Sequence, residues 1–585
     1  MKNSYNKINP LRSSKRNEMK RAIFSFSKRE WFVFLALALA LLVSTIGILG
    51  KINKSFMVSV PMEGGTIKEG IIGTPRFVNP ILASTEADRA LVTLVYSGLM
   101  RKSVDDTIIP DLAESVETTP DGLSYTFVLK NEIYFHDKKP VTVDDVIFTI
   151  NAIKDPIIKS PRKGNWDGVT TERVDDRTIR FTLKQPFANF LENATVPIMP
   201  AHIWENSPIE LNEANLYPVG SGPYQVLKVN KESSGIVNSY ELISFKDFTL
   251  GKPYIRKINL SFYPNEDDAI AAERDGKIDQ LGSISPENTI NLRQRDSTIT
   301  SSVLPRIFGL FFNQNENQIF TNKNVVSAIE KAIDKDRIIQ EVLGGYGVSI
   351  DNPIPAHVLP STNTSALSTQ EAKIEEAKEI LKRDGWSIGE SGYLEKTVTD
   401  SNKKKTTATI SFSISTGNAP ELAKSAEIIK ENLTALGMKV DVKVFEVGNL
   451  NQSVIRPRNY DALLFGEIIN TESDLYAFWH SSERKDPGLN VAMYTNAKVD
   501  KILEDTFGNQ DQALRQKKYM QMVDEIKKDM PAVFLYSPSF IYIVSKDLQG
   551  LNIDHLIFPS DRFLNAYLWY TKTDNVWKIF APSTR

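Results

Sequence analysis

The chain lacks cysteine altogether and has only five histidines among its 585 residues. The absence of cysteine excludes disulfide bonds, thiolate metal sites, a cysteine nucleophile and lipid attachment through an N-terminal cysteine. No two histidines have the i, i+4 spacing of a helical zinc site, so we expect no metal site. Phosphate-binding glycine patterns and the GxSxG nucleophile pattern are also missing. We therefore predict a protein without cofactor, without catalytic residues and without enzymatic activity.

Positive charge is concentrated at the N-terminus. Residues 1–30 hold nine Lys/Arg and two acidic residues. Subtracting these from the chain totals of 70 and 72 leaves 61 basic and 70 acidic side chains, a net charge of −9 over the remaining 555 residues. Phosphate binding needs a concentrated basic surface, so the acidic body argues against nucleic acid as a partner.

One long apolar run follows this basic segment. Residues 31–50 contain no charge, and a helix of that length at about 1.5 Å per residue spans roughly the 30 Å hydrocarbon layer of a bilayer. The positive-inside rule places residues 1–30 in the cytoplasm and the body outside the membrane. We predict an uncleaved single-pass anchor in the cell membrane. A cleaved signal peptide is the alternative, although only Thr45-Ile46-Gly47 resembles a cleavage site.

The body alternates helical and strand patterns. Residues 124–129 follow a Pro-Asp-Gly turn and are typical of a strand, and Thr142 opens a helix with a capping-box pattern. Amphipathic helices are predicted at 371–381, 421–436 and 513–529, with strands at 439–445 and, interrupted at Pro538, at 533–544. A helix, a glycine and then a strand indicate an α/β fold.

Seven sequence motifs occur in a fixed order: LVYSGLMR at 94–101, IPDLAES at 109–115, DGLSYTFVL at 121–129, FHD at 135–137, PVTVDDVIF at 140–148, VPIMPAHI at 196–203 and PVGSGPY at 218–224. Together with later similarities up to residue 560, this series resembles family 5 of the extracellular solute-binding proteins. These are the peptide- and nickel-binding subunits of ABC importers. The motifs mark the scaffold and do not identify the ligand.

The resemblance implies a two-lobed α/β fold, of the type II periplasmic-binding-protein class, with an extra inserted domain. It divides the N-terminal part into a cytoplasmic tail (1–30), an anchor (31–50) and a linker (51–65). The body then consists of a discontinuous lobe I (66–108, 217–305 and 545–585), an inserted domain (109–216) and lobe II (306–544). The ligand is expected between the lobes, which close around it by a hinge motion.

Three segments correspond to the family's ligand contacts. These are the loop 73–79, the strand end 311–313 and the segment 465–479, and the candidate ligand-binding residues are Phe77, Asn79, Phe311, Asn313, Glu467, Asn470, Glu472, Asp474 and Trp479. The aromatic residues among them, Phe77, Phe311 and Trp479, could instead be buried in the hydrophobic core.

The segment 465–474 departs from the family pattern. It reads FGEIINTESD, where peptide binders often have Trp, Asp and an Asp-Pro pair, so Asn470 stands at about the position of the amine-binding aspartate. Losing that charge removes a charge-assisted hydrogen bond of about 1.5–3 kcal/mol. Glu467, Glu472 and Asp474 are the nearby carboxylates that could replace it.

The resemblance implies a membrane-tethered, monomeric substrate-binding protein that delivers peptide-like solutes to the permease subunits of an ABC importer. Two alternatives stay open. The chain could be a ligand sensor or scaffold that keeps the fold without transport, or it could bind a non-peptide solute such as an oligosaccharide or a metal chelate.

Overall fold

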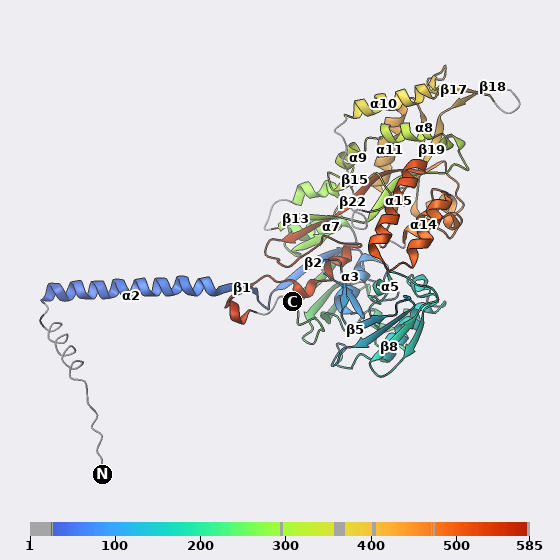
Figure 1. Ribbon diagram of the computed structural model, residues 1–585. Coiled ribbons are helices and arrows are strands. Elements are labelled where there is room, and N and C mark those ends of the chain that lie inside the picture. Colours follow the sequence, from blue (N-terminus) through green and yellow to red (C-terminus); the bar gives the residue numbers. More distant parts are fainter. Residues whose placement is uncertain are drawn as a thin grey trace, which may run out of the picture. The chain divides into compact units, whose positions relative to one another are not determined.

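The computed structural model describes residues 25, 27–103, 105–292, 297–355, 369–399, 405–469, 471 and 474–581 (Figure 1). It divides into two compact units, one of Met1–Met62 with Lys572–Arg585 and one of Glu63–Thr571. The fold is mixed α/β, as predicted.

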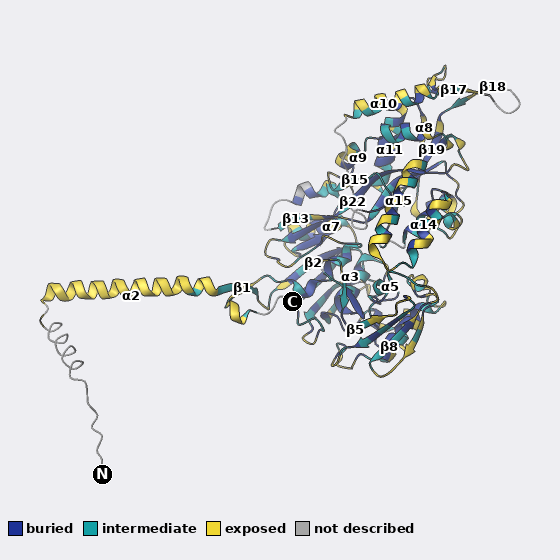
Figure 2. Cartoon of the chain, viewed as in Figure 1, coloured by how far each residue is buried: buried dark blue, intermediate teal, exposed yellow. Residues whose placement is uncertain are grey.

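The first unit is dominated by one exposed helix, α2 (Lys28–Phe56), whose residues are all solvent-accessible (Figure 2). Ser27 and Glu30 cap its start: the Ser27 backbone N–H donates to Glu30 Oε2 at 2.7 Å. Among the described residues, α2 is the one helix long and apolar enough to cross a membrane. The segment expected as a linker is partly ordered, because residues 57–61 form strand β1 (Met57–Pro61), which pairs with β23 (Thr573–Trp577).

The second unit contains a first core built around a mixed sheet and helix α3 (Glu86–Val95). The strands of the sheet are β2 (Thr66–Ile72), β9 (Tyr224–Lys231), β10 (Val237–Ser244), β11 (Lys257–Tyr263), β12 (Gln280–Gly282) and β13 (Ser297–Val303). Helix α7 (Glu266–Arg274) packs with Leu281 and Ile543 in a separate, smaller cluster. Strands β11 and β12 pair in parallel with β2, whereas β9, β10 and β11 form an antiparallel meander.

A second core lies within residues 81–214. It is formed by the four-stranded antiparallel sheet β5-β6-β8-β7, helix α4 and short connecting elements: β3 (Met100–Lys102), β4 (Ile108–Pro110), β5 (Ala113–Thr118), β6 (Ser124–Leu129), α4 (Val143–Lys154), β7 (Thr170–Arg173), β8 (Thr178–Thr182), α5 (Phe190–Asn193) and α6 (Ala201–Trp204). Alternate residues of β6 are buried, as a half-buried strand requires. Ile81, Leu99 and Met100 also join this core.

A third core covers both faces of a second sheet. The strands are β14 (Arg306–Phe312), β19 (Ser411–Gly417), β20 (Lys439–Phe445), β21 (Ala462–Ile468) and the first half of β22 (Ala532–Ser545). One face packs against α8 (Lys323–Ala332), α9 (Lys335–Glu341), α10 (Gln370–Arg383) and α11 (Pro420–Ala435), and the other against α13 (Asp474–Trp479), α14 (Ala497–Phe507) and α15 (Gln512–Asp529). Shorter strands complete this region: β15 (Gly347–Ser349), β16 (Ser387–Ile388), β17 (Leu394–Thr399) and β18 (Lys405–Thr409).

Strand β22 connects the two large sheets. Its residues up to Pro538 pair with β14 and β15, and its residues from Ser539 on pair with β12 and β13. The strand runs through Pro538 without a break, so the predicted interruption is wrong. The change of partners therefore occurs between Pro538 and Ser539, within the strand.

Two of the sequence motifs meet at His136. Its Nε2 lies 3.0 Å from the Gly222 carbonyl oxygen, and its backbone N–H donates to the Gly220 carbonyl oxygen at 2.8 Å. The same turn abuts the end of α3, where a Cβ on Gly220 would lie 2.2 Å from the Val95 carbonyl oxygen. Only glycine fits there, which gives the PVGSGPY motif its structural role.

A buried ion cluster holds the C-terminal return of the second unit, which is the segment 546–571 that follows β22. The Arg562 guanidinium, 2% exposed, donates to Glu69 on β2 at 2.8 Å and to Glu86 on α3 at 2.9 Å. The Tyr542 hydroxyl donates to the other Glu69 oxygen at 2.8 Å, so β2, α3, β22 and the return segment share one network.

We predict that Arg562→Met lowers the free energy of unfolding by about 3–5 kcal/mol, because it leaves the Glu69 charge buried without its partner. Urea denaturation measures the loss. The control is Arg173→Met, which removes an exposed arginine paired with Asp144 and Asp176 and should change stability by less than about 1 kcal/mol. Equal effects of the two substitutions would contradict this role for the cluster.

A second prediction concerns acid sensitivity. Desolvation lowers the pKa of His136 from 6.5 to about 4 in the folded protein, so between these values only the unfolded chain takes up the proton. Stability should therefore fall as the pH drops from about 6.5 to about 4, and His136→Gln should remove about 1–3 kcal/mol of that fall. Urea midpoints measured across this range test it. An unchanged pH dependence in His136→Gln would show that other groups cause the acid sensitivity.

Candidate functional site

A cavity of about 520 Å³ opens where the three cores of the second unit meet. We call it the junction cavity. Helix α3, the second core, the C-terminal return and helix α15 all contribute to its wall, including Arg89, Asn165, Asn193, Arg515, Gln516 and Asp561. Its volume falls in the usual range for small-molecule sites.

The wall of the junction cavity carries charges of both signs that are mostly paired. Arg101 Nε donates to Asp111 Oδ2 at 2.7 Å, and Lys102 forms an ion pair with Asp106. Asp561 accepts backbone N–H groups of Ile557 and Phe558, and desolvation raises its pKa. The cavity is therefore polar and suits a ligand with both donors and acceptors.

Arg89 differs from these charges. Its guanidinium stacks on Phe558, 4.2 Å from the ring centroid, and within the described part of the chain no group accepts a hydrogen bond from it. A half-buried guanidinium at a cavity wall can bind a carboxylate in bidentate fashion. The sequence analysis missed Arg89, because a single arginine in an amphipathic helix has no distinguishing pattern.

A second cavity, of about 270 Å³, lies within the third core. We call it the Glu467 cavity. Its wall is largely apolar and is formed by Val447, Leu450, Ile455, Phe465, Phe478, Leu489 and Val491, with the polar residues Asn451, Arg456, Arg458, Glu467 and Asp486. The two arginines are already engaged: Arg456 lies 3.7 Å from Asp486, and Arg458 donates to the carbonyl oxygens of three residues.

Glu467 is 2% exposed, and its Oε2 has no hydrogen-bond partner among the described residues. Strand alternation explains its position, because Leu463 and Phe465 of β21 face the same way into the core on this side of the sheet. Burial raises the pKa of this carboxyl well above its usual value. A buried carboxyl group without a partner is costly unless something binds to it.

The two cavities share the segment predicted to contact ligand. Glu467 and Phe478 line the Glu467 cavity, whereas Thr471 and Asp474 line the junction cavity. Asp474 also accepts the Thr471 backbone N–H at 3.0 Å, which fixes the start of α13. Residues of β21, of α13 and of the segment between them thus line the two cavities. Asn470 and Glu472 lie outside the described residues.

The loop 73–79 is held by Asp88 on α3. One oxygen of this buried carboxylate accepts the backbone N–H groups of Arg76 and Phe77, at 2.7 and 2.9 Å. Phe77 is half-buried, with the Arg76 guanidinium over its ring. Asn79 is fully buried, and its Oδ1 accepts the Ile81 backbone N–H at 2.9 Å. Neither Phe77 nor Asn79 is among the residues that line the two cavities.

Three further candidates are buried in the third core. Phe311 and Trp479 pack together at 6.4 Å between ring centroids, and Trp479 also contacts Tyr494 and Phe534. Asn313 donates from Nδ2 to the Arg458 carbonyl oxygen at 2.8 Å and accepts the Asn315 backbone N–H. These contacts occupy the amide of Asn313 and the rings of Phe311 and Trp479, whereas the buried Trp479 Nε1 has no hydrogen-bond partner among the described residues.

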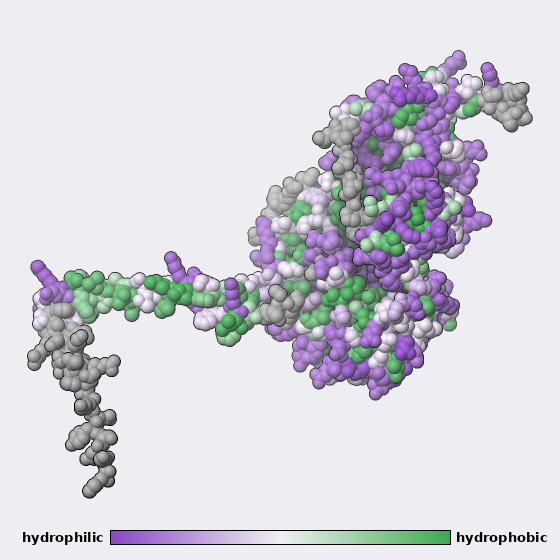
Figure 3. All heavy atoms as spheres, in the orientation of Figure 1, coloured by the Kyte–Doolittle hydropathy of each residue, from purple (hydrophilic) through white to green (hydrophobic). Residues whose placement is uncertain are grey.

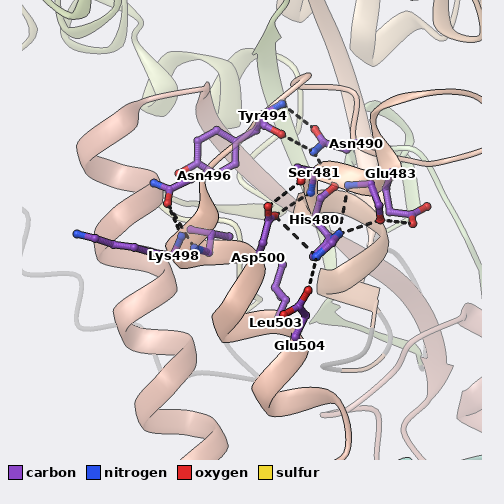
Figure 4. Close-up of polar contacts among 12 residues, drawn as sticks. His480, Ser481, Glu483, Asn490, Tyr494, Asn496, Lys498, Asp500, Leu503 and Glu504 are labelled. Atoms are coloured by element: carbon purple, nitrogen blue, oxygen red, sulfur yellow. Dashed lines mark hydrogen bonds and ion pairs between the residues drawn. The ribbon is translucent and has the colours of Figure 1, made fainter. Parts of the chain in front are cut away.

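His480 is the centre of a polar network between α13 and α14 (Figure 4). Its Nδ1 lies 2.8 Å from Ser482 Oγ and accepts the Ser482 backbone N–H, while Nε2 faces Glu504 at 3.5 Å. Ser481 is bound to Asp500 through both its N–H and its hydroxyl. The imidazole thus caps the turn after α13. Within the described part of the chain, no group of three His, Asp or Glu side chains could hold a metal ion.

A family model, "Bacterial extracellular solute-binding proteins, family 5 Middle", matches residues 107–486. The chain belongs to this solute-binding protein family. It is 28% identical, over 87% of its length and 92% of the relative, to the oligopeptide-binding protein AppA of Bacillus subtilis (strain 168).

Solved structures of the solute-binding protein family agree with the fold. The structure of Bacillus subtilis AppA in complex with a nonapeptide matches with a TM-score of 0.66 at 27% identity, covering 88% of this chain and all of AppA. The ABC transporter substrate-binding protein CtaP of Listeria monocytogenes matches with a TM-score of 0.72 at 24% identity, covering 87% of this chain and 99% of CtaP, and this likeness concerns the fold alone. A further relative, the glutathione-binding protein GsiB of Escherichia coli (strain K12), is 24% identical over 81% of this chain and 89% of the relative.

Proposed function

We propose that this chain is a membrane-tethered, extracytoplasmic substrate-binding protein that captures peptide-like solutes and delivers them to the permease of an ABC importer. The observation that carries this proposal is the junction cavity, which is polar and takes its wall from all three cores. A ligand there would contact every part of the second unit at once, so binding would favour one arrangement of those parts. The complex of the homologue AppA with a nonapeptide supports a peptide ligand.

We assign the first core and the C-terminal return to lobe I, the second core to the inserted domain and the third core to lobe II. The chain crosses between the lobes twice, at Leu304-Pro305 and near Pro538. Proline has no N–H to donate to a strand ladder, which locally reduces the number of hydrogen bonds at each crossing. Hinges are commonly a few residues at the ends of elements, so these two crossings are the expected hinge.

The N-terminal helix supports attachment to the membrane. Its apolar run has the length of a bilayer core, it is fully exposed, and basic residues precede it. We propose that α2 stays in place as a single-pass anchor, with the second unit outside the cytoplasm. The protein acts as a monomer in this proposal.

The Glu467 cavity, which is separate from the junction cavity, would add a chemical preference. An unpartnered carboxyl group in an apolar cavity would bind a cationic group of the ligand, either a free amino terminus or a basic side chain, by a charge-assisted hydrogen bond. This contact would replace the amine-binding aspartate that the sequence lacks at Asn470. Because burial raises the pKa of Glu467, binding of the cation would release a proton, and affinity for cationic ligands would rise with pH.

Native mass spectrometry of the full-length protein, purified gently in detergent from a peptide-rich host, tests the proposed function. We expect a series of adducts that fragment as peptides and that disappear after partial unfolding and refolding. A single discrete non-peptide adduct would replace the peptide with another solute. A protein that stays empty with every peptide pool would contradict solute capture and favour a sensor or scaffold.

We predict that Glu467→Gln weakens binding of peptides with a free amine or a lysine by about 10–100-fold, which corresponds to the loss of one charge-assisted hydrogen bond. Calorimetry should find little change for an N-acetylated peptide without basic residues. Glu427→Gln, an exposed carboxylate paired with Lys430, is the matched control and should leave both affinities unchanged. Equal losses for cationic and neutral peptides would contradict a charge contact at Glu467.

A further inference from the structure

The C-terminal end of the chain folds back onto the segment that follows α2. Strand β23 pairs with β1 in antiparallel register over five positions, from Met57 opposite Trp577 to Pro61 opposite Thr573. Strand β1 follows α2 directly, since the helix ends at Phe56 and the strand begins at Met57. The last described residues are therefore held beside the end of the apolar helix, within the same unit.

These last residues expose large apolar side chains. Trp577 is 47% exposed, Ile579 is 76% exposed and Phe580 is 74% exposed. We call these three residues the tail patch. Ile579 and Phe580 belong to a short turn of 3₁₀ helix, Lys578–Phe580, that has no buried residue. Single exposed apolar residues are normal on a protein surface, but a contiguous apolar patch marks an interaction site, so these three neighbouring side chains indicate a surface that something covers.

The position of Trp577 along α2 identifies that partner. The uncharged run of α2 ends at Gly50, and Asn53 lies three residues further, about 4.5 Å along the helix axis. The Trp577 indole Nε1 donates to Asn53 Oδ1 at 2.8 Å. The polar layer on each side of a bilayer is about 5–7 Å thick, so the indole lies at the depth of the headgroups.

The surrounding residues suit the same environment. Ile52 and Phe56 continue the exposed apolar surface of α2 past Gly50, as Figure 3 shows for the helix as a whole. Lys51, Lys54 and Lys578 stand among these apolar residues. Aromatic rings with nearby lysines are typical of the interfacial layer, where the rings enter the acyl boundary and the ammonium groups meet anionic headgroups.

We propose that the tail patch inserts into the extracytoplasmic headgroup layer of the bilayer that α2 crosses, as a second membrane contact supplied by the C-terminus. This inference rests on the proposed anchor role of α2. A single helix is free to rotate about its axis. A second contact, fixed to the helix through β1 and β23, gives the first unit one defined face toward the lipid. The pairing of β1 with β23 thus holds the tail patch beside α2, although the two segments are about 520 residues apart in sequence.

The absence of cysteine makes the test clean, because one introduced cysteine can be labelled alone. The full-length protein would carry a nitroxide at Ile579→Cys, in vesicles of phosphatidylcholine and phosphatidylglycerol. The experiment compares how often the nitroxide collides with oxygen, which concentrates in lipid, and with a nickel chelate, which stays in water. Leu39→Cys within α2 is the lipid reference, and Ile157→Cys, 80% exposed in the second unit, is the water reference.

We expect the label at 579 to collide with oxygen more often, and with the nickel chelate several-fold less often, than the label at 157. Adding Trp577→Ala should shift the label at 579 toward the water reference. If the label at 579 behaves like the label at 157, the tail patch is in water and the proposal is overturned. If it is shielded from both reagents, protein covers the patch, from a second copy or the chain itself, and the proposal is overturned as well. If the label at 39 is itself in water, the anchor role fails, and the tail contact fails with it.

Discussion

The pairing of β22 with four strands is the constraint on which the second unit depends. Its first half completes the sheet of the third core beside β14, and its second half completes the first core beside β12 and β13. Side chains alternate along a strand, so a slip of one residue would move Val533 and Leu535 to the opposite face of the third core's sheet and would turn Tyr542 and Val544 out of the first core. One register therefore fixes two hydrophobic cores at once.

The junction cavity is a hollow lined by helix α3, the second core, the return segment after β22 and helix α15. The return segment after β22 then closes one side of that hollow, and the Arg562 cluster holds it against β2 and α3. Arg89 and Asp561 reach the junction cavity because α3 and the return segment pack together there. The polar wall is thus a consequence of how the first core is completed.

Patterns with a local cause were predictable from the sequence. The helices α10, α11 and α15 and the strands β6 and β20 appear within a residue or two of the predicted ranges, because periodicity, capping and glycine placement act over a few residues. Contacts between distant segments were not. Nothing in residues 51–65 predicts a strand paired with residues 573–577, and Pro538 suggested a break that the pairing with β15 removes. The burial of Phe311 and Trp479 likewise depends on α13 and α14 covering that face of the sheet. The charge of Glu467 was visible in the sequence, but the cavity around it forms only when β21, α13 and residues 447–456 come together.

Glu467 connects the stability of the unit to its proposed function. A carboxyl group buried without a partner weakens the empty protein, since desolvation is not compensated by a hydrogen bond. Replacing it with an apolar residue would relieve that strain and remove the group that can recognise a cation. The cavity walls around it are apolar, so water offers the carboxyl group little compensation. A cationic ligand group would meet a carboxyl oxygen, Oε2, that has no hydrogen-bond partner among the described residues, and the cost of burying it in the empty state would become part of the driving force for binding.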